Sequence, residues 1–362
     1  MRQDKVLNKA QLEEFGAKIE AIRQKHLADV GEKDARYIKR VEKAVRYTEV
    51  AGRVMLMAGF FPPAFVAGTL SLAVSKILDN MELGHNVMHG QYDFMQEPRL
   101  MGQTFEWDTW CPSEAWRYSH NFRHHTYTNV LGEDHDVGYG VLRLFPEQKW
   151  EPRFLANLPM AFILAVFFEN LLALQTLEIE KVFSGEKTWK QIWKESVPMR
   201  KKAGRQILKD YVFFPLIAGP FFLPVLAGNF LANILRNLWT FTIIFCGHFT
   251  ENAELFDKSV LDNETQAHWY LRQLKGSSNL TGGKLFHIMS GNLSHQIEHH
   301  LFPEVPAHRY AEMSVEVQAI CKEYGIHYNK ASLPKQFGTV VARLFKFSLP
   351  GRNSKAKLAH SA

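Results

Sequence analysis

The sequence predicts an all-α integral membrane protein with two transmembrane helical hairpins and a cytosolic helical cap that carries a histidine-rich metal site. Three observations lead to this fold class. Apolar residues gather in a few segments, although the mean hydropathy of the 362-residue chain is only −0.20. The stretches between these segments are polar and basic. The 16 histidines fall largely into clusters close to the ends of the apolar segments.

The composition limits the partners and the compartment. The net charge of +6 and the isoelectric point near 9.0 suit an anionic membrane surface or an anionic ligand. No nucleic-acid motif accompanies this charge, so we expect no nucleic-acid partner. Cys111, Cys246 and Cys321 are few and far apart, which argues against a disulfide framework or a cysteine-rich zinc site. The N-terminus has no apolar run, so we expect no signal peptide.

We divide the chain into three parts. Residues 1–46 contain no proline and repeat apolar residues at helical spacing, which predicts one or two amphipathic cytosolic helices that either dock on lipid headgroups or are solvated. Residues 47–325 form the predicted membrane domain. Residues 326–362 are a basic cytosolic tail, which we expect to be disordered from Leu349 onward.

The first predicted hairpin covers residues about 47–83. Val54–Leu78 is nearly uncharged and is long enough for one span of about 20 residues. A hairpin with Tyr47–Phe61 as its first leg and a turn at Pro62-Pro63 places Arg53 inside that leg, which is costly. We nevertheless favour the hairpin, because it returns the chain to its starting side before the first histidine cluster.

Residues 155–177 are apolar but are interrupted by Glu169, Asn170 and Gln175. A spanning helix is one interpretation, and an amphipathic helix at the membrane interface is the other. We place the segment at the interface, because a third span would put the second and third histidine clusters on opposite faces of the membrane.

The second predicted hairpin covers residues 211–248. Tyr211–Ala227 and Phe230–His248 are apolar, and we expect a turn at Gly228-Asn229 between them. Arg236 must either extend to the interface or pair with a buried group. The preceding segment 181–209 holds nine Lys or Arg, and two hairpins place all basic clusters on the cytoplasmic side, as the positive-inside rule requires.

Three histidine clusters and one further histidine supply candidate metal ligands. Histidines four residues apart share one face of a helix, and neutral imidazole is a common ligand of first-row transition metals. The candidates are His85, His89, His120, His124, His125, His248, His299 and His300, with His295 and Gln296 beside the last pair. They are too many for one tetrahedral zinc ion, and an all-imidazole pair of ions suits iron or copper.

Other polar residues near the clusters receive lesser roles. Glu82 lies three residues before His85 but has no partner of the same form, so we treat it as supporting or incidental. Glu133, Asp134 and Asp136 are placed to orient ligand histidines through the second ring nitrogen. His135 is expected in an exposed loop, and we expect structural roles for His268, His287 and His308. A metal transporter is disfavoured, because its ligands would lie at mid-membrane.

The pattern HxxxH, HxxxHH and QxxHH around two membrane hairpins resembles the membrane fatty acid desaturase superfamily over about residues 45–325. The segments HNFRHHTYTN (His120–Asn129) and QIEHHLFP (Gln296–Pro303) resemble bacterial acyl-CoA desaturases, a group related to front-end and linoleoyl-CoA desaturases. This resemblance implies two Fe2+ ions on the cytosolic side and removal of two hydrogens from an acyl chain by O2 and two electrons.

The resemblance also implies roles for individual residues. The ligands and catalytic residues would be His85, His89, His120, His124, His125, His299 and His300, with His248 as an additional ligand. Many relatives carry a histidine where this chain has Gln296, so His295 or a water held by Gln296 would complete the metal site. The implied reaction inserts a cis double bond into a long saturated acyl-CoA, with the delta-9 position taken from the bacterial relatives. An acyl-lipid desaturase and an alkane or fatty acyl hydroxylase are the alternatives.

The partners follow from the same resemblance. No cytochrome b5-like domain is visible, so electrons would come from a separate ferredoxin, rubredoxin or flavin reductase. Trp107, Trp110 and Trp116 would line an acyl tunnel or simply pack in a core. The basic stretches 181–209 and Lys330–Arg343 would bind the phosphates of CoA or determine topology. We expect a multi-pass protein of a bacterial inner membrane with its active site facing the cytoplasm.

Overall fold

The computed structural model describes residues 6–350, and nearly all of its regular structure is helical. The predicted disorder of the tail therefore falls mostly outside the described residues. The chain forms two compact units that alternate along the sequence. The first unit contains described residues 6–32, 119–162 and 242–350, and the second contains residues 33–118 and 163–241.

The first unit holds short helices, one long N-terminal helix and one pair of strands. Its elements are α1 (Lys9–Ala28), α6 (His125–Tyr127), η5 (Gly138–Gly140), η6 (Pro152–Ala156), η9 (Lys258–Leu261), α14 (Gln266–Gly276), β1 (Asn279–Thr281), α15 (Lys284–Met289), η10 (Leu293–His295), α16 (Gln296–Leu301), η11 (Ala307–Arg309), α17 (Tyr310–Tyr324), β2 (Lys330–Ser332) and α18 (Leu333–Ser348).

Helix α1 begins where Asn8 and Gln11 form a reciprocal capping box. Its buried residues repeat at helical spacing and pack against α14 and α17. Gly16 permits this close packing, because a Cβ there would lie 2.6 Å from the Cβ of Ala267. The predicted boundary after residue 46 falls inside the next helix, α2 (Glu32–Leu56).

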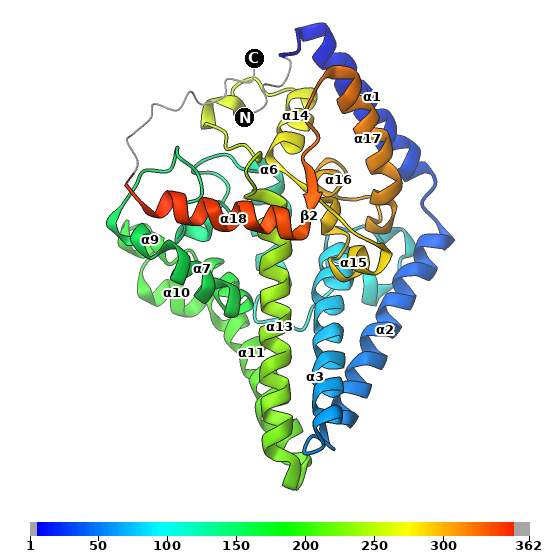
Figure 1. Ribbon diagram of the computed structural model, residues 1–362, viewed down its shortest axis with the longest axis vertical. Coiled ribbons are helices and arrows are strands. Elements are labelled where there is room, and N and C mark those ends of the chain that lie inside the picture. The colour runs from blue at the N-terminus through cyan, green and yellow to red at the C-terminus, as the bar shows by residue number, and fades with distance from the viewer. Residues whose placement is uncertain (1–5, 351–362) are drawn as a thin grey trace. The chain divides into compact units, whose positions relative to one another are not determined.

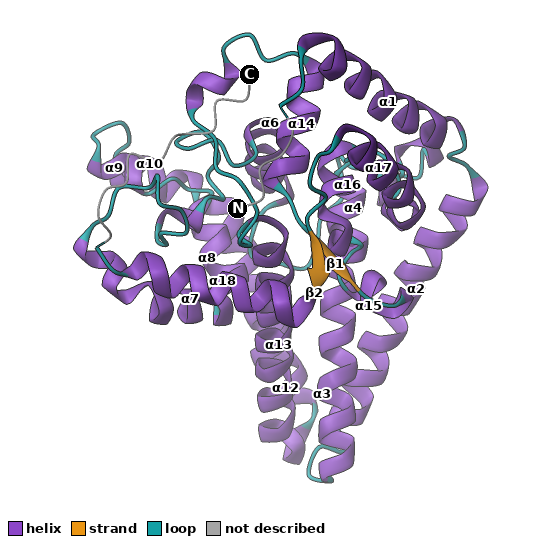
Figure 2. Ribbon diagram, turned by 45° about the horizontal axis from the view of Figure 1, so that its top comes forward, coloured by secondary structure: helices purple, strands orange, loops and turns teal. Residues whose placement is uncertain are grey.

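The strands β1 and β2 pair in parallel, with Asn279 opposite Lys330 (Figure 2). This short ladder joins the segment before α16 to the segment before α18. It therefore anchors the third histidine cluster to the C-terminal part of the unit.

The second unit is built from helices. Its elements are α2, α3 (Pro62–Ile77), η1 (Leu78–His85), α4 (Asn86–Met88), η2 (Asp93–Met95), η3 (Pro98–Leu100), α5 (Ser113–Trp116), α8 (Phe168–Gln175), α9 (Glu180–Phe183), α10 (Trp189–Glu195), α11 (Val197–Ile207), η7 (Leu208–Phe213), α12 (Phe214–Ile217) and η8 (Gly219–Phe221). Four helices have residues in both units, namely α2, of which only Glu32 falls in the first unit, η4 (Arg117–His124), α7 (Asn157–Val166) and α13 (Phe222–His248).

Helices α2 and α3 form a helical hairpin (Figure 1). The Ser71 and Ser75 hydroxyls donate to the carbonyl oxygens of Thr48 and Val45, which fixes the antiparallel register. A Cβ at Gly52 would lie 2.8 Å from the backbone nitrogen of Leu72, so the two backbones approach closely. The chain reverses between Leu56 and Pro62, next to the Pro62-Pro63 pair that predicted the turn.

The predicted turn at Gly228-Asn229 is wrong. Helix α13 runs unbroken through both residues, and the turn comes earlier, after α12, where Gly219 adopts a φ of 57° and Pro220 follows. Gly228 serves packing instead, because a Cβ there would lie 2.4 Å from Leu56 Cδ2. Asn229 is buried and accepts a hydrogen bond from Arg53 at 2.7 Å. Residues typical of turns thus serve helix contacts here.

The segment 155–177 is not one continuous helix. It forms α7 and α8, which bend by 99° at Phe167. The Asn237 side-chain amide donates to the carbonyl oxygen of Val166 at 2.8 Å, which satisfies a backbone group at the break. The bend places buried Glu169 in a salt bridge with buried Arg236. Of the two alternatives for Arg236, the buried pair is confirmed.

One stretch of the described chain, Gly219–His248, is long and apolar enough to cross a membrane. The helices Pro152–Val166 and Phe168–Gln175 meet the same criteria of length and composition only when they are taken together, and they are bent relative to each other. Neither α2 nor α3 meets them. The helical class is therefore confirmed, while two transmembrane hairpins stay a prediction.

Candidate metal centre

The first histidine cluster lies in the second unit, where η1 ends and α4 begins. His85 and His89 follow each other on successive turns, with ring centroids 4.7 Å apart. The Trp116 ring lies edge-on to both, at 5.3 Å from His85 and 5.7 Å from His89. Helix η1 has the wide i→i+5 turn of a π-helix, a form that often re-aims side chains at functional sites. The sequence carried no signal for it.

The second cluster also begins in a π-helix, η4, which ends at His124. The ring centroids of His120 lie 5.2 Å from His124 and 4.9 Å from His125. His124 Nδ1 donates to a carboxylate oxygen of buried Asp134 at 3.0 Å. Asp134 in turn accepts from the backbone N–H of Asn129 at 2.8 Å. This set holds the His124 ring in one orientation and leaves Nε2 for another contact.

The charges around His124 favour a cation. Burial lowers the pKa of this imidazole, but Asp134 and Asp136 outweigh burial and raise the pKa to about 9. Burial likewise opposes ionisation of Asp134, and the neighbouring His124 holds the pKa of that carboxyl below its ordinary value. The role expected of Asp134 as an orienting carboxylate agrees with its hydrogen bonds.

The third cluster lies in α16, where His299 and His300 are fully buried. His300 Nδ1 donates to Gln273 Oε1 at 2.9 Å. The His300 ring stacks on His125 with centroids 4.3 Å apart, and His299 lies 4.7 Å from His125. Burial lowers the pKa of His300 well below its ordinary value, so the ring stays neutral. Sequence reasoning missed Gln273, which lies in an ordinary helix with no motif around it.

His248 brings three ring nitrogens together. Its Nε2 lies 3.3 Å from Nε2 of His124 and 3.1 Å from Nε2 of His300. The Nδ1 of each ring faces an acceptor. For His248 this is the carbonyl oxygen of Gly276 at 3.3 Å, and for His124 and His300 it is Asp134 and Gln273. An imidazole that keeps its proton on Nδ1 offers the Nε2 lone pair to a metal ion, and the three Nε2 atoms converge here. A metal ion would take the place of any proton shared between these atoms, so the three residues fit a metal ion.

Gln296 lies beside this group. Its side-chain nitrogen lies 2.9 Å from His248 Nε2, and its Oε1 is buried with no hydrogen-bond partner among the described residues. Exchanging the two amide atoms would aim the oxygen at the group, since the assignment of amide oxygen and nitrogen follows the surrounding hydrogen bonds. A Cβ at Gly247 would lie 2.9 Å from Gln296 Cγ, so the glycine makes room for this side chain.

His295 occupies a different position. Its ring lies 4.5 Å from His287, and it is buried, but it joins none of the groups of converging ligand atoms among the described residues. His287 is held by Ser294 Oγ at 2.7 Å, in agreement with a structural role. Of the two candidates for the position left by the missing histidine, Gln296 is therefore the one next to a ligand group.

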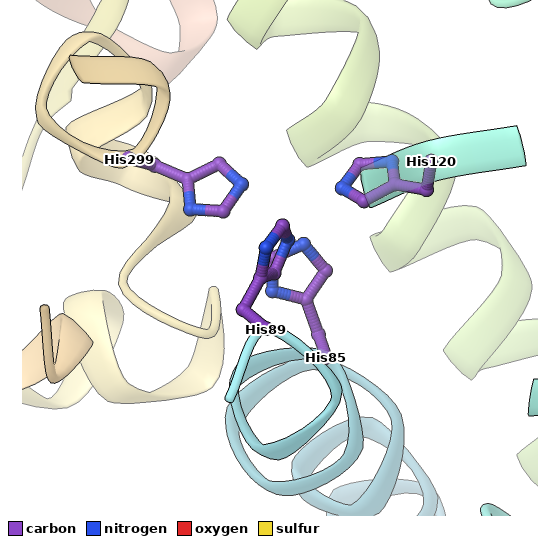
Figure 3. A group of neighbouring side chains, drawn as sticks. All are labelled: His85, His89, His120 and His299. Atoms are coloured by element: carbon purple, nitrogen blue, oxygen red, sulfur yellow. The ribbon is translucent and has the colours of Figure 1, made fainter. Parts of the chain in front are cut away.

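His120 and His299 form a further pair of ligand candidates in the first unit. Their rings are nearly parallel, with centroids 6.2 Å apart, and Figure 3 shows a ring nitrogen of each directed toward the other. The same figure shows His85 and His89 rising from one helix of the second unit. His120 also combines with His124 and Asp136 in a group of converging ligand atoms.

The remaining sequence candidates have structural contacts. Glu82 accepts a hydrogen bond from the Tyr37 hydroxyl at 2.6 Å and joins no ligand group among the described residues, which agrees with a supporting role. Trp107 and Trp116 lie in a buried apolar cluster, with Trp110 packed against it. The free cysteines are all buried, and burial raises the pKa of Cys111 to about 12, so this thiol is a poor nucleophile or ligand.

Comparison with known proteins completes the description of the site. Residues 61–332 match the profile of the fatty acid desaturase family. The chain is 44% identical over 350 residues to the NADPH-dependent stearoyl-CoA 9-desaturase of Mycobacterium tuberculosis, covering 96% of this chain and 82% of the relative. It is 27% identical over 281 residues to the sn-1 linoleoyl-lipid 6-desaturase of Synechocystis sp., covering 76% and 77%. It is 22% identical over 266 residues to the enzyme of that name from Arthrospira platensis, covering 72% and 70%.

Proposed function

Because the chain belongs to the fatty acid desaturase family, we propose that it inserts a cis double bond at the delta-9 position of a long saturated acyl-CoA, using O2 and two electrons. The name of the mycobacterial relative supports both the CoA ester and the position, at 44% identity over nearly the whole chain. The cyanobacterial relatives, whose names give lipid-linked substrates, share only 27% and 22% identity with this chain. An acyl-lipid substrate is therefore the second candidate.

The observation that carries this proposal is the meeting of three imidazole Nε2 atoms in the first unit. We assign one iron ion to His124, His248 and His300, with Gln296 or a water that it holds as a further ligand. Within the first unit, His120, His125 and His299 would contribute ligands to the second ion. His85 and His89 of the second unit are the remaining ligands that the family pattern implies. Iron suits this donor set, because imidazole binds Fe2+ while leaving positions open for other ligands.

The two ions would supply the oxidising power that an inert C–H bond requires. The chain's own residues position them. Asp134 and Gln273 hold the rings of His124 and His300 through Nδ1, and the carbonyl oxygen of Gly276 does the same for His248. Complete burial of these rings keeps bulk water away from the ligand atoms.

The electrons come from outside the chain in this proposal. The relative's name includes NADPH, which supports a reductase that takes electrons from NADPH and passes them on directly or through a small carrier. The net charge of +6 suits an acidic partner. We also propose that the protein is multi-pass, with α13 as one span and its histidines on the cytoplasmic side.

The test is conversion of substrate by the full chain. Purified protein in lipid nanodiscs would receive stearoyl-CoA, O2, NADPH and a compatible reductase, and the product would be analysed for double-bond position. We expect a delta-9 product from the wild type, none from His124→Ala and near-normal amounts from the matched control His268→Gln. A hydroxylated product, or conversion of phosphatidylcholine-linked stearate in place of stearoyl-CoA, would contradict the proposal.

A further inference from the structure

Helix α18, at the C-terminal end of the described chain, carries three distinct faces. Val340, Leu344 and Phe347 are buried against the first unit. A row at four-residue spacing is exposed, with Phe337 at 36%, Val341 at 39% and Phe345 at 59%. At about 100° per residue, the lysines Lys335 and Lys346 lie roughly opposite the buried face. Both lysines are exposed.

The helix is fixed to the body of the first unit, so its exposed row is a permanent surface. The Trp150 indole donates to the carbonyl oxygen of Ser348 at 2.9 Å, and the Asn157 amide donates to that of Leu344 at 3.1 Å. Arg343 donates to the carbonyl oxygen of Glu251 at 3.0 Å and lies over the Phe145 ring. These contacts hold the buried face and leave the Phe337–Phe345 row outside.

A second exposed apolar row lies on the neighbouring segment of the same unit. Helix α18 contacts η6, which leads directly into α7. Leu155 is 60% exposed, Leu158 37% and Phe162 67%, again at helical spacing. These residues belong to the bent helix pair whose length and composition suit a membrane. An element in contact with α18 thus also exposes apolar residues, and apolar surfaces of this kind are the ones that lipid covers.

The charge of this region matches an anionic lipid surface. The described residues 324–350 contain four Lys or Arg and no Asp or Glu. Basic residues near an anionic leaflet are attracted to its headgroups. A second copy of the chain would instead bring the same lysines face to face across a symmetric contact, and their repulsion disfavours that occupant.

We propose that α18 lies in the plane of the membrane, with Phe337, Val341 and Phe345 inserted among the acyl chains and Lys335 and Lys346 at anionic headgroups. This contact is separate from the predicted transmembrane spans and does not depend on the reaction. It makes the C-terminal helix an interfacial anchor for the unit that holds His124, His248 and His300.

The experiment measures which side of α18 faces lipid. The full chain is placed in nanodiscs of phosphatidylcholine and phosphatidylglycerol, with single spin labels introduced through Phe337→Cys, Val341→Cys or Phe345→Cys. Lys335→Cys and Lys346→Cys are the water-facing controls, and Val340→Cys is the protein-covered control. The native cysteines are buried, and the unsubstituted chain checks that they do not react. Power-saturation EPR then gives the accessibility of each label to O2 and to a water-soluble nickel chelate.

We expect the ratio of O2 to nickel-chelate accessibility to be several-fold higher at the three apolar positions than at the two lysine positions. High nickel-chelate accessibility at all three would overturn the proposal, because it would place the row in water. Low accessibility to both reagents would also overturn it, because another protein surface would then cover the row. Replacing phosphatidylglycerol by phosphatidylcholine should lower the ratio at Val341. An unchanged ratio would contradict the proposed contact with anionic headgroups. None of these readouts requires activity.

Discussion

At the scale of single residues, the hydrogen bond made by Nδ1 of each ligand histidine fixes the ring and so directs Nε2 toward a metal ion. Asp134 is the only carboxylate hydrogen-bonded to a member of the His124–His248–His300 group among the described residues, and it also ties down the backbone of Asn129. Its charge raises the affinity of His124 for a cation and fixes the ring orientation. The metal group therefore depends on a residue that would touch no metal itself.

Asp134→Asn tests this dependence. The amide keeps the size of the side chain but loses the charge and one acceptor, so we expect iron affinity to fall by about 10- to 100-fold. Iron retained by the purified protein during dialysis against a chelator measures the loss. Asp262→Asn, at an exposed position, serves as the control. Equal iron retention by Asp134→Asn and the wild type would mean that the carboxylate has no such role.

Gln296 gives a second prediction at this scale. Gln296 contacts His248 and has an oxygen without a hydrogen-bond partner among the described residues. Gln296→Ala should therefore weaken binding of the ion that His248 holds and lower turnover. Gln296→His returns an imidazole and should keep the iron. Paired iron assays and turnover of the two variants provide the measurement. Full iron and full turnover in Gln296→Ala would exclude Gln296, and a water that it holds, as a functional ligand.

At the scale of helices, buried charge joins elements that are far apart in the sequence. Asp210 accepts from Arg53 and from Lys76, both at 2.7 Å, and all three side chains are buried. Asp210→Asn would replace the carboxylate that these two buried cations share with a neutral amide, which we expect to cost about 3–5 kcal/mol of stability. A lower midpoint of thermal unfolding in detergent is the expected result. A midpoint within error of the wild type would show that solvent or lipid already screens these cations.

The α2–α3 hairpin gives the other prediction at this scale. Gly52→Ala would place a methyl group 2.8 Å from the Leu72 nitrogen and 2.9 Å from the Gly68 oxygen, both backbone atoms that cannot move away cheaply. We expect a loss of about 1–3 kcal/mol. Gly204→Ala, at an exposed position of α11 where an added Cβ would meet nothing beyond its own helix within 4 Å, should be neutral or stabilise the protein by up to about 1 kcal/mol. Equal unfolding midpoints for the two variants would mean that α2 and α3 are not closely packed.

At the scale of the whole molecule, the sequence indicates the candidate histidines more directly than the path of the chain. Histidine spacing is a local signal, so the clusters around His85, His120 and His299 were visible in the sequence, as was His248. The turn at Gly228-Asn229 was misassigned because the same residues suit a tight turn and a close helix contact. The partner of Arg236 is Glu169, 67 positions away, and no local pattern encodes that pairing. Gln273 was missed for the same reason.

The central claim is that these histidines hold two iron ions that desaturate an acyl-CoA. The most direct measurement is Mössbauer spectroscopy with metal analysis on the full chain, correlated with turnover of stearoyl-CoA by the same preparation. We predict two irons per chain in the active wild type. In His248→Ala, whose imidazole meets those of His124 and His300, we predict loss of the iron that these residues hold and loss of turnover. Zinc without iron in an active preparation, or full activity with iron absent, would contradict the account.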